Sequence, residues 1–159
     1  MTKQDAGHAA DGPNEPRSEL PHQGRLAGID FGTVRIGIAI SDPGQILASP
    51  HENYTRQDEQ RDAMHFRELV EEESIVGFVV GLPIHLSGDE SEKSLQAREF
   101  GAWLSKLSEK PVVFHDERYT SVDAEEHLLA ANLTRQRRKA RLDMLAAQMI
   151  LRSYLETRP

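Results

Sequence analysis

The order of its apolar segments is the feature that most constrains how this chain can fold. An apolar segment over residues 25–31 is followed by a second over residues 35–41, in which isoleucine alternates with small residues. Gly32-Thr33 between them is a tight-turn signal, so the two segments predict a hairpin. A third extended segment over residues 46–54 continues the meander, although a proline within it weakens its pairing.

After the meander, helical and extended patterns alternate along the chain. A continuous apolar run is typical of a strand buried on both faces, whereas apolar residues three and four apart predict a helix. The expected elements are a helix over 58–73, a strand over 75–80, a helix with its core stripe at 100–107, a strand over 111–115, a helix from residue 120 and a last helix around 142–153. This order predicts an α/β fold with a mixed five-stranded sheet flanked by helices. Its parallel strands would end at one edge, where open sheets form their sites.

The composition predicts one folded domain behind a tail. Residues 1–24 contain Gly, Pro and charged residues but almost no large apolar ones, so we expect a disordered N-terminal tail over 1–24. The remaining residues 25–159 fit a single domain. Cysteine is absent, which excludes disulfides, thiolate zinc sites and cysteine nucleophiles. No apolar run approaches the roughly 20 residues that cross a bilayer, and no secretory signal is present, so we expect a cytoplasmic protein without a membrane partner.

Three acidic residues adjoin apolar segments, where packing alone does not favour them. Asp30 lies inside the first strand, Glu117 directly follows a buried strand, and Asp143 neighbours the apolar stripe of the last helix. A charge at the edge of a core is costly unless it is paired or bound to a metal. Three carboxylates converging from separate elements would form an all-oxygen site, which is the kind that Mg²⁺ or Mn²⁺ prefers.

Each acid also has a structural alternative. Asp30 could cap the turn that follows it, Glu117 could pair with Arg118, and Asp143 could pair with a neighbouring basic residue. None of these alternatives explains why all three acids lie next to apolar faces. Adjacent alanines at 146 and 147 would also let the last helix approach the sheet closely and carry Asp143 inward.

The net charge of −7 is unevenly distributed. Residues 25–131 carry −10, whereas residues 132–159 carry +5, and most of the basic groups form one cluster: Arg135, Arg137, Arg138, Lys139 and Arg141. This cluster could be a solvated helix start, or it could bind phosphate. With the acids nearby, we expect it to guide a nucleic-acid backbone toward the acidic site.

Four blocks of the sequence resemble the YqgF family, in the same order. The first reads GIDFGTVRIGIAISD over residues 28–42. The others are Gly81-Leu82-Pro83, then Asp116-Glu117-Arg118 with Thr120, then Asp143 with Ala146-Ala147, Ile150-Leu151 and Tyr154-Leu155. Each block alone is weak, but four in order are a strong signal. The resemblance spans about residues 25–156 and is to RuvC-like proteins described as pre-16S rRNA nucleases and earlier as Holliday junction resolvases.

The resemblance implies a ribonuclease-H-like fold in which Asp30, Glu117 and Asp143 are the catalytic acids and bind Mg²⁺ or Mn²⁺. It implies a hydrolase acting on phosphodiester bonds, with RNA, and the ribosomal RNA precursor in particular, favoured over a branched DNA junction. Ribosomal precursor particles are then candidate partners of a monomer or homodimer. Two metals about 3.5–4 Å apart can activate water and stabilise the leaving oxygen. Asp30 would bridge them, because a central strand fixes it most rigidly.

Two other classes of function are kept as alternatives. A non-catalytic nucleic-acid-binding assembly factor would not need the intact set of acids. An ATP-binding sugar-kinase-like domain shares a similar Asp-Phe-Gly-Thr hairpin, but this chain is short for the two domains that clamp ATP.

Four further residues are candidates for accessory roles: Thr33, Arg35, His85 and Arg118. His85 could contact phosphate or move a proton, although a plain surface histidine is the simpler interpretation. The family usually has an Asn, and then an Asp or Asn, where this chain has His85 and Ser87. Val34 replaces a usual Lys and Tyr119 a usual Leu. These differences concern the substrate-facing loop rather than the acids.

Overall fold

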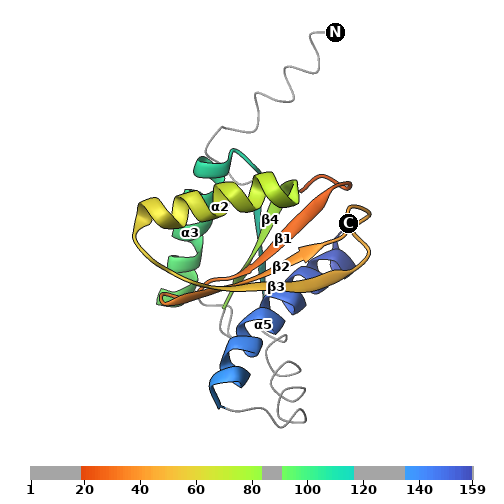
Figure 1. Cartoon of the computed structure of the whole chain (residues 1–159). Coiled ribbons are helices and arrows are strands. Elements are labelled where there is room, and N and C mark those ends of the chain that lie inside the picture. Colours follow the sequence, from red (N-terminus) through yellow and green to blue (C-terminus); the bar gives the residue numbers. More distant parts are fainter. Residues whose placement is uncertain (1–18, 84–90, 117–134, 159) are drawn as a thin grey trace.

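A computed structural model describes residues 19–83, 91–116 and 135–158. Over these residues the strands form one five-stranded sheet with helices on both faces (Figure 1). In chain order the elements are β1 (Arg25–Asp30), β2 (Arg35–Ser41), β3 (Ala48–Thr55), α2 (Glu59–Glu73), β4 (Ile75–Leu82), α3 (Glu92–Ser108), β5 (Val112–Asp116) and α5 (Arg135–Thr157).

The sheet is mixed, with strand order β3-β2-β1-β4-β5. Strands β1, β2 and β3 pair antiparallel, whereas β4 pairs parallel with both β1 and β5. The α/β fold with a mixed five-stranded sheet is therefore confirmed. The third strand begins at Ala48 rather than at residue 46. Its proline is tolerated because β3 is an edge strand and Pro50 lies at a register shift of the pairing with β2. The helix expected from residue 120 falls outside the described residues.

The two faces of the sheet are covered differently. Helices α2 and α3 pack on one face, and α5 lies across the other (Figure 1). Strand alternation sorts the side chains between them. In β1, Ala27 and Ile29 join the core under α2 and α3, whereas Leu26 joins the core under α5. The side under α2 and α3 is filled by bulky aromatic residues such as Phe66 and Phe100, whereas the buried core under α5 consists of aliphatic residues.

The segment before β1 belongs to the fold, which corrects the expected tail boundary at residue 24. Leu20 is only 3% exposed and packs in the core under α5. Gln45 donates from its side-chain amide to the carbonyl oxygens of Pro21 and Gly24, at 2.9 Å each, and the Gly24 N–H donates to the carbonyl of Pro43. Composition missed this contact because a single leucine among polar residues shows no periodicity. The expected tail over residues 1–18 lies outside the described residues.

This docking leads to a stability prediction that the composition alone would not make. Leu20→Ala should lower the free energy of unfolding by roughly 2–4 kcal/mol, because it leaves a cavity beneath α5. Removing residues 1–23 should cost at least as much. Leu47→Ala is the matched control, since Leu47 is 67% exposed, and should change stability by less than about 0.5 kcal/mol. Urea unfolding of the three variants measures the difference, and wild-type stability in Leu20→Ala would show that this segment does not dock.

Among the described helices, none is long and apolar enough to span a membrane.

Candidate active site

Asp30 is the last residue of β1 and is partly buried. Its cross-strand partner in β2 is Gly37. Since side chains alternate along a strand and Leu26 faces α5, Gly28 and Asp30 face α5 as well. The first of the three expected acids therefore lies at the carboxyl end of a central strand, on the face that α5 covers.

Asp143 is brought to the same place by an unusually close helix–strand contact. A Cβ atom built on Gly37 would lie 2.1 Å from the backbone carbonyl oxygen of Asp143, so the backbone of α5 rests directly on β2 at this position. Gly37 is paired with Asp30, and the contact therefore places Asp143 beside the end of β1. Asp30 and the backbone of Asp143, distant in sequence, are thus both neighbours of Gly37.

A second glycine extends this contact along the helix. A Cβ atom on Gly28 would lie 2.7 Å from the Cβ of Leu151 and 2.8 Å from the carbonyl oxygen of Ala147. Ala147 is itself fully buried, in agreement with the expected close approach of α5 to the sheet. Gly28 and Gly37 allow the close approach from the side of the sheet, because neither has a side chain that would clash with α5. Their role was not predicted from the sequence. The feature that could have indicated it is a glycine at a strand position on the face that a helix covers.

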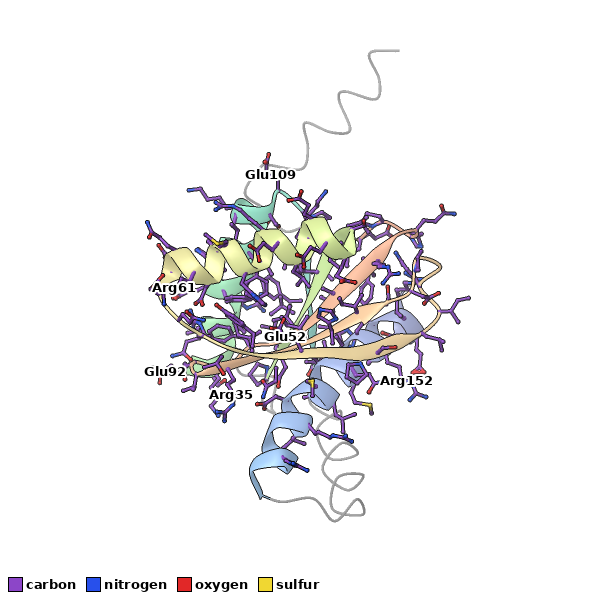
Figure 2. All side chains as sticks on the ribbon, viewed as in Figure 1. Arg35, Glu52, Arg61, Glu92, Glu109 and Arg152 are labelled. Carbon is purple, nitrogen blue, oxygen red and sulfur yellow. The ribbon has the colours of Figure 1, made fainter. Side chains whose placement is uncertain are left out.

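Arg35, an expected accessory residue, pairs with Asp143. Its Nε lies 3.5 Å from Oδ2 of Asp143, and the side chains are 32% and 26% exposed. Arg35 begins β2, at the end of the sheet next to the turn that follows Asp30 (Figure 2). At this distance and exposure the pair contributes little to stability. Its consequence is electrostatic, because a guanidinium lies at the acidic site.

The third expected acid follows the end of β5. Strands β1, β4 and β5 run parallel, and Leu82 at the end of β4 pairs with Asp116 at the end of β5. These ends share one edge with Asp30. Glu117 is the next residue along the chain but lies outside the described residues, as do Arg118, Tyr119, His85 and Ser87. Within the described ranges, no group of three acidic or histidine side chains could hold a metal ion. The three-carboxylate site thus stays a prediction, with Asp30 and the backbone of Asp143 both next to Gly37.

The expected basic cluster forms the first turns of α5, the helix that also carries Asp143. Arg137 and Arg141 are exposed. The side chains of Arg135, Arg138 and Lys139 are not described, so their expected role in binding nucleic acid stays a prediction.

His115 lies in β5 and behaves as a strand residue, as expected. Burial lowers its pKa, and its Nε2 lies 2.7 Å from the Ser153 hydroxyl oxygen.

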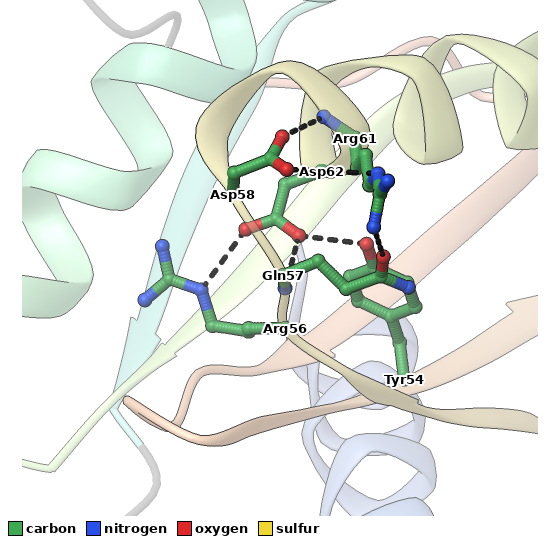
Figure 3. A network of polar contacts seen from close by, with 6 residues as sticks. All are labelled: Tyr54, Arg56, Gln57, Asp58, Arg61 and Asp62. Atoms are coloured by element: carbon green, nitrogen blue, oxygen red, sulfur yellow. Dashed lines mark hydrogen bonds and ion pairs between the residues drawn. The ribbon is translucent and has the colours of Figure 1, made fainter.

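A buried acid on the opposite face was missed by the sequence analysis. Asp62 of α2 is 2% exposed, and its Oδ1 accepts hydrogen bonds from the Tyr54 hydroxyl at 2.6 Å and the Gln57 N–H at 2.8 Å (Figure 3). Its Oδ2 lies 3.4 Å from Nε of Arg56. Burial, together with Asp62, raises the pKa of Tyr54 to about 12, so its hydroxyl stays a donor at neutral pH. The available signal was an acid one turn before Phe66, on the apolar face of its helix.

Comparison with known proteins identifies the family. A family model described as "RuvX: Holliday junction resolvase" matches residues 24–157. A protein of Rhodopirellula baltica named "Putative pre-16S rRNA nuclease" is 47% identical over 137 residues, which cover 86% of this chain and 79% of that protein. A protein of the same name from Koribacter versatilis is 42% identical over 135 residues, covering 85% and 88%.

Solved structures agree on the fold. T. thermophilus RuvC in complex with a Holliday junction substrate aligns with a TM-score of 0.54 and 15% identity, over 84% of this chain and 96% of that one. A fowlpox virus resolvase in complex with Holliday junction DNA aligns with a TM-score of 0.51 and 11% identity, over 84% and 97%. The expected ribonuclease-H-like fold, shared with RuvC, is confirmed. Because the family match covers nearly the whole chain and the sequence blocks resemble the same family, this chain belongs to the RuvX family, also called YqgF.

Proposed function

We propose that this chain is a metal-dependent nuclease that hydrolyses phosphodiester bonds in the ribosomal RNA precursor. The observation that carries the proposal is that Asp30 and the backbone of Asp143 both adjoin Gly37, at the carboxyl end of β1. Two relatives with 47% and 42% identity bear the name of a pre-16S rRNA nuclease, which supports RNA as the substrate. A cytoplasmic location follows from this substrate.

The residues at the end of β1 fit a hard divalent cation. Asp30 and Asp143 offer carboxylate oxygens from two elements, and both are only partly exposed. Glu117 follows the end of β5, which lies two strands from β1 at the same edge of the sheet. Mg²⁺ and Mn²⁺ prefer such oxygen ligands. Asp30, Asp143 and Glu117 would hold the metal. Bound there, the metal supplies a more acidic water and neutralises charge on the leaving oxygen.

Arg35 and the basic start of α5 complete the proposed site. The Arg35 guanidinium balances Asp143 and offers a planar fork of donors to a phosphate that enters beside it. Arg137 and Arg141 are exposed on the helix that leads to Asp143, and with their basic neighbours they would attract the nucleic-acid backbone. This local attraction offsets the acidic character of the rest of the chain.

A second candidate is the cleavage of branched DNA. The description of the matching family as a Holliday junction resolvase favours it. Both candidates share the fold, the acids and the metal, so the substrate distinguishes them. A non-catalytic assembly factor would differ from both, because it would bind nucleic acid without cleaving it.

The test offers three substrates side by side with Mg²⁺ or Mn²⁺: a structured pre-16S rRNA fragment, single-stranded RNA of the same length and a four-way DNA junction. We expect cleavage of the rRNA precursor at a defined position and its loss with EDTA. Cleavage of the junction alone would replace the proposal by the second candidate. Tight binding of the precursor without cleavage in any metal would contradict a nuclease altogether.

A further inference from the structure

A cavity of about 310 Å³ lies on the opposite face of the sheet from Asp30, at the same strand end. It is half open to solvent and is bordered by the turn after β1, the segment between β3 and α2, and helices α2 and α3. Its lining residues are Phe31, Thr33, Arg56, Asp62, Phe100 and Trp103, together with Glu59, Gln96 and Glu99. The proposed cleavage chemistry uses none of them.

The walls of the cavity are flat and aromatic. Phe31 and Phe100 contact each other with ring centroids 4.8 Å apart, and Phe100 and Trp103 with centroids 5.4 Å apart. The Arg56 guanidinium lies 5.1 Å from the centroid of Phe31. Phe100 is buried, whereas Phe31 and Trp103 are partly exposed. Unstacked nucleobases bind on such aromatic and guanidinium planes. The volume is at the lower end of the roughly 300–1,000 Å³ of small-molecule sites, which suits a single base.

The charges of the cavity exclude a phosphate and favour hydrogen-bond donors. Arg56 is engaged by Asp62, and the other charged lining residues, Glu59 and Glu99, are acidic. Carboxylates accept hydrogen bonds from the exocyclic amino groups of bases, as glutamate does from cytosine. Cytosine, adenine and guanine carry such an amino group, whereas uracil has a single ring donor, N3–H, flanked by two carbonyl oxygens that these carboxylates repel. These charges favour a base that carries an amino group.

The cavity is held in shape before any ligand binds. The backbone N–H of Arg56 donates to the carbonyl of Val34 at 2.9 Å, which ties the segment before α2 to the turn after β1. Asp62 then holds the Arg56 side chain and the Gln57 N–H (Figure 3). Because Asp62 is buried and its carboxylate oxygens are bonded, the partly exposed Arg56 side chain is already held over Phe31 before a ligand binds. Such preorganisation reduces the cost of ordering on binding.

We propose that this cavity binds an unstacked, amino-bearing nucleobase of the RNA substrate. In the RNA chain this base would lie near the phosphate that binds at the proposed Asp30 site. Asp30 and Phe31 are consecutive and face opposite sides of the sheet, and Thr33 is an exposed lining residue in the turn between them and β2. RNA that passes over this turn can place a phosphate on one side and a neighbouring base on the other. The inference rests on the proposed function and adds a base preference to it.

Trp103 provides a direct test, because it is the only tryptophan of the chain. Its fluorescence is followed while the metal-free full-length protein is titrated in EDTA with the RNA hexamers rC6, rA6 and rU6. We expect rC6 and rA6 to bind and to change the emission, with rC6 about tenfold tighter than rU6, as expected for hydrogen bonds to a charged acceptor. Glu99→Gln should reduce this ratio severalfold, since an amide can both donate and accept.

Glu68→Gln on the exposed surface of α2 is the matched control, because it removes the same charge outside the cavity and should leave the rC6 to rU6 ratio unchanged. Equal affinity for rC6 and rU6, no binding of any hexamer, or a ratio unaffected by Glu99→Gln would each overturn the inference. Free CMP binding as tightly as rC6 would instead assign the cavity to a free nucleotide. Cleavage of the rRNA precursor is measured on the same preparation. Normal cleavage without a base preference would refute only the base-binding role of the cavity. A base preference without cleavage would refute only the nuclease function.

Discussion

Asp30→Asn should abolish metal-dependent cleavage while the protein remains folded. Asparagine preserves the size of the side chain and one oxygen but removes the charge that balances a divalent cation. Losing a residue that only hydrogen-bonds a metal ligand lowers metal affinity or activity by about 10–100-fold. Losing a ligand itself should therefore lower the cleavage rate by at least about 100-fold. If the three acids share one site, removing one charge relieves repulsion in the metal-free protein, so the variant should melt at the wild-type temperature or slightly above it.

The measurement is paired on one purified sample: the melting temperature without metal, and the rate of cleavage with Mn²⁺. A destabilised Asp30→Asn whose remaining activity follows its folded fraction would refute the carboxylate site. It would indicate instead that Asp30 caps the turn after β1.

Asp42→Asn is the matched control, because Asp42 is an acid with a visible structural role. Its Oδ1 accepts hydrogen bonds from the Ile46 and Leu47 N–H groups at 2.8 and 2.7 Å, and the Leu47 bond is the main cause of its lowered pKa. We expect this variant to be less stable at neutral pH but active once folded. Since a lowered pKa stabilises the fold only while the group is ionised, its stability difference from wild type should shrink as the pH falls below the ordinary value of 3.8.

Gly37→Ala should separate Asp143 from Asp30 and strongly destabilise the fold. The added Cβ would lie 2.1 Å from the carbonyl oxygen and 2.6 Å from the carbonyl carbon of Asp143, and both are backbone atoms that no rotamer change can move. Overpacking usually costs 1–3 kcal/mol, and this rigid contact should cost roughly 3 kcal/mol or more. For a chain of this size we expect a melting temperature lower by about 10 °C. Because α5 must move away from β2, the folded fraction should also lose cleavage activity.

Gly44→Ala serves as the control for the loss of a glycine. Its added Cβ would meet only side chains, the nearest being an Asp42 oxygen at 3.3 Å, in an exposed turn. Thermal melting and cleavage per folded molecule are compared for the two variants. Wild-type stability and activity in Gly37→Ala would show that α5 does not rest on β2 as the structure has it.

Local sequence patterns determined the elements of this fold and the first member of its site. An apolar segment before a tight turn predicted β1, and alternation predicted β2. Continuous apolar runs predicted β4 and β5, and helical spacing predicted α2, α3 and the inner face of α5. Asp30 was identified because a charge inside an apolar strand requires a partner. Each of these inferences depends on residues a few positions apart, whose mutual geometry is fixed by the element itself.

The tertiary structure alone decided which segments meet. Leu20 packs under α5, Arg35 pairs with Asp143, and Gly37 contacts the backbone of α5. The residues next to them in the sequence do not indicate these partners. The buried network of Asp62 and the cavity beside Phe31 arise in the same way, from the packing of α2 and α3 against the turn after β1. The physical reason is that periodicity reports which face of an element is buried, whereas the partner of that face is set by how the layers pack.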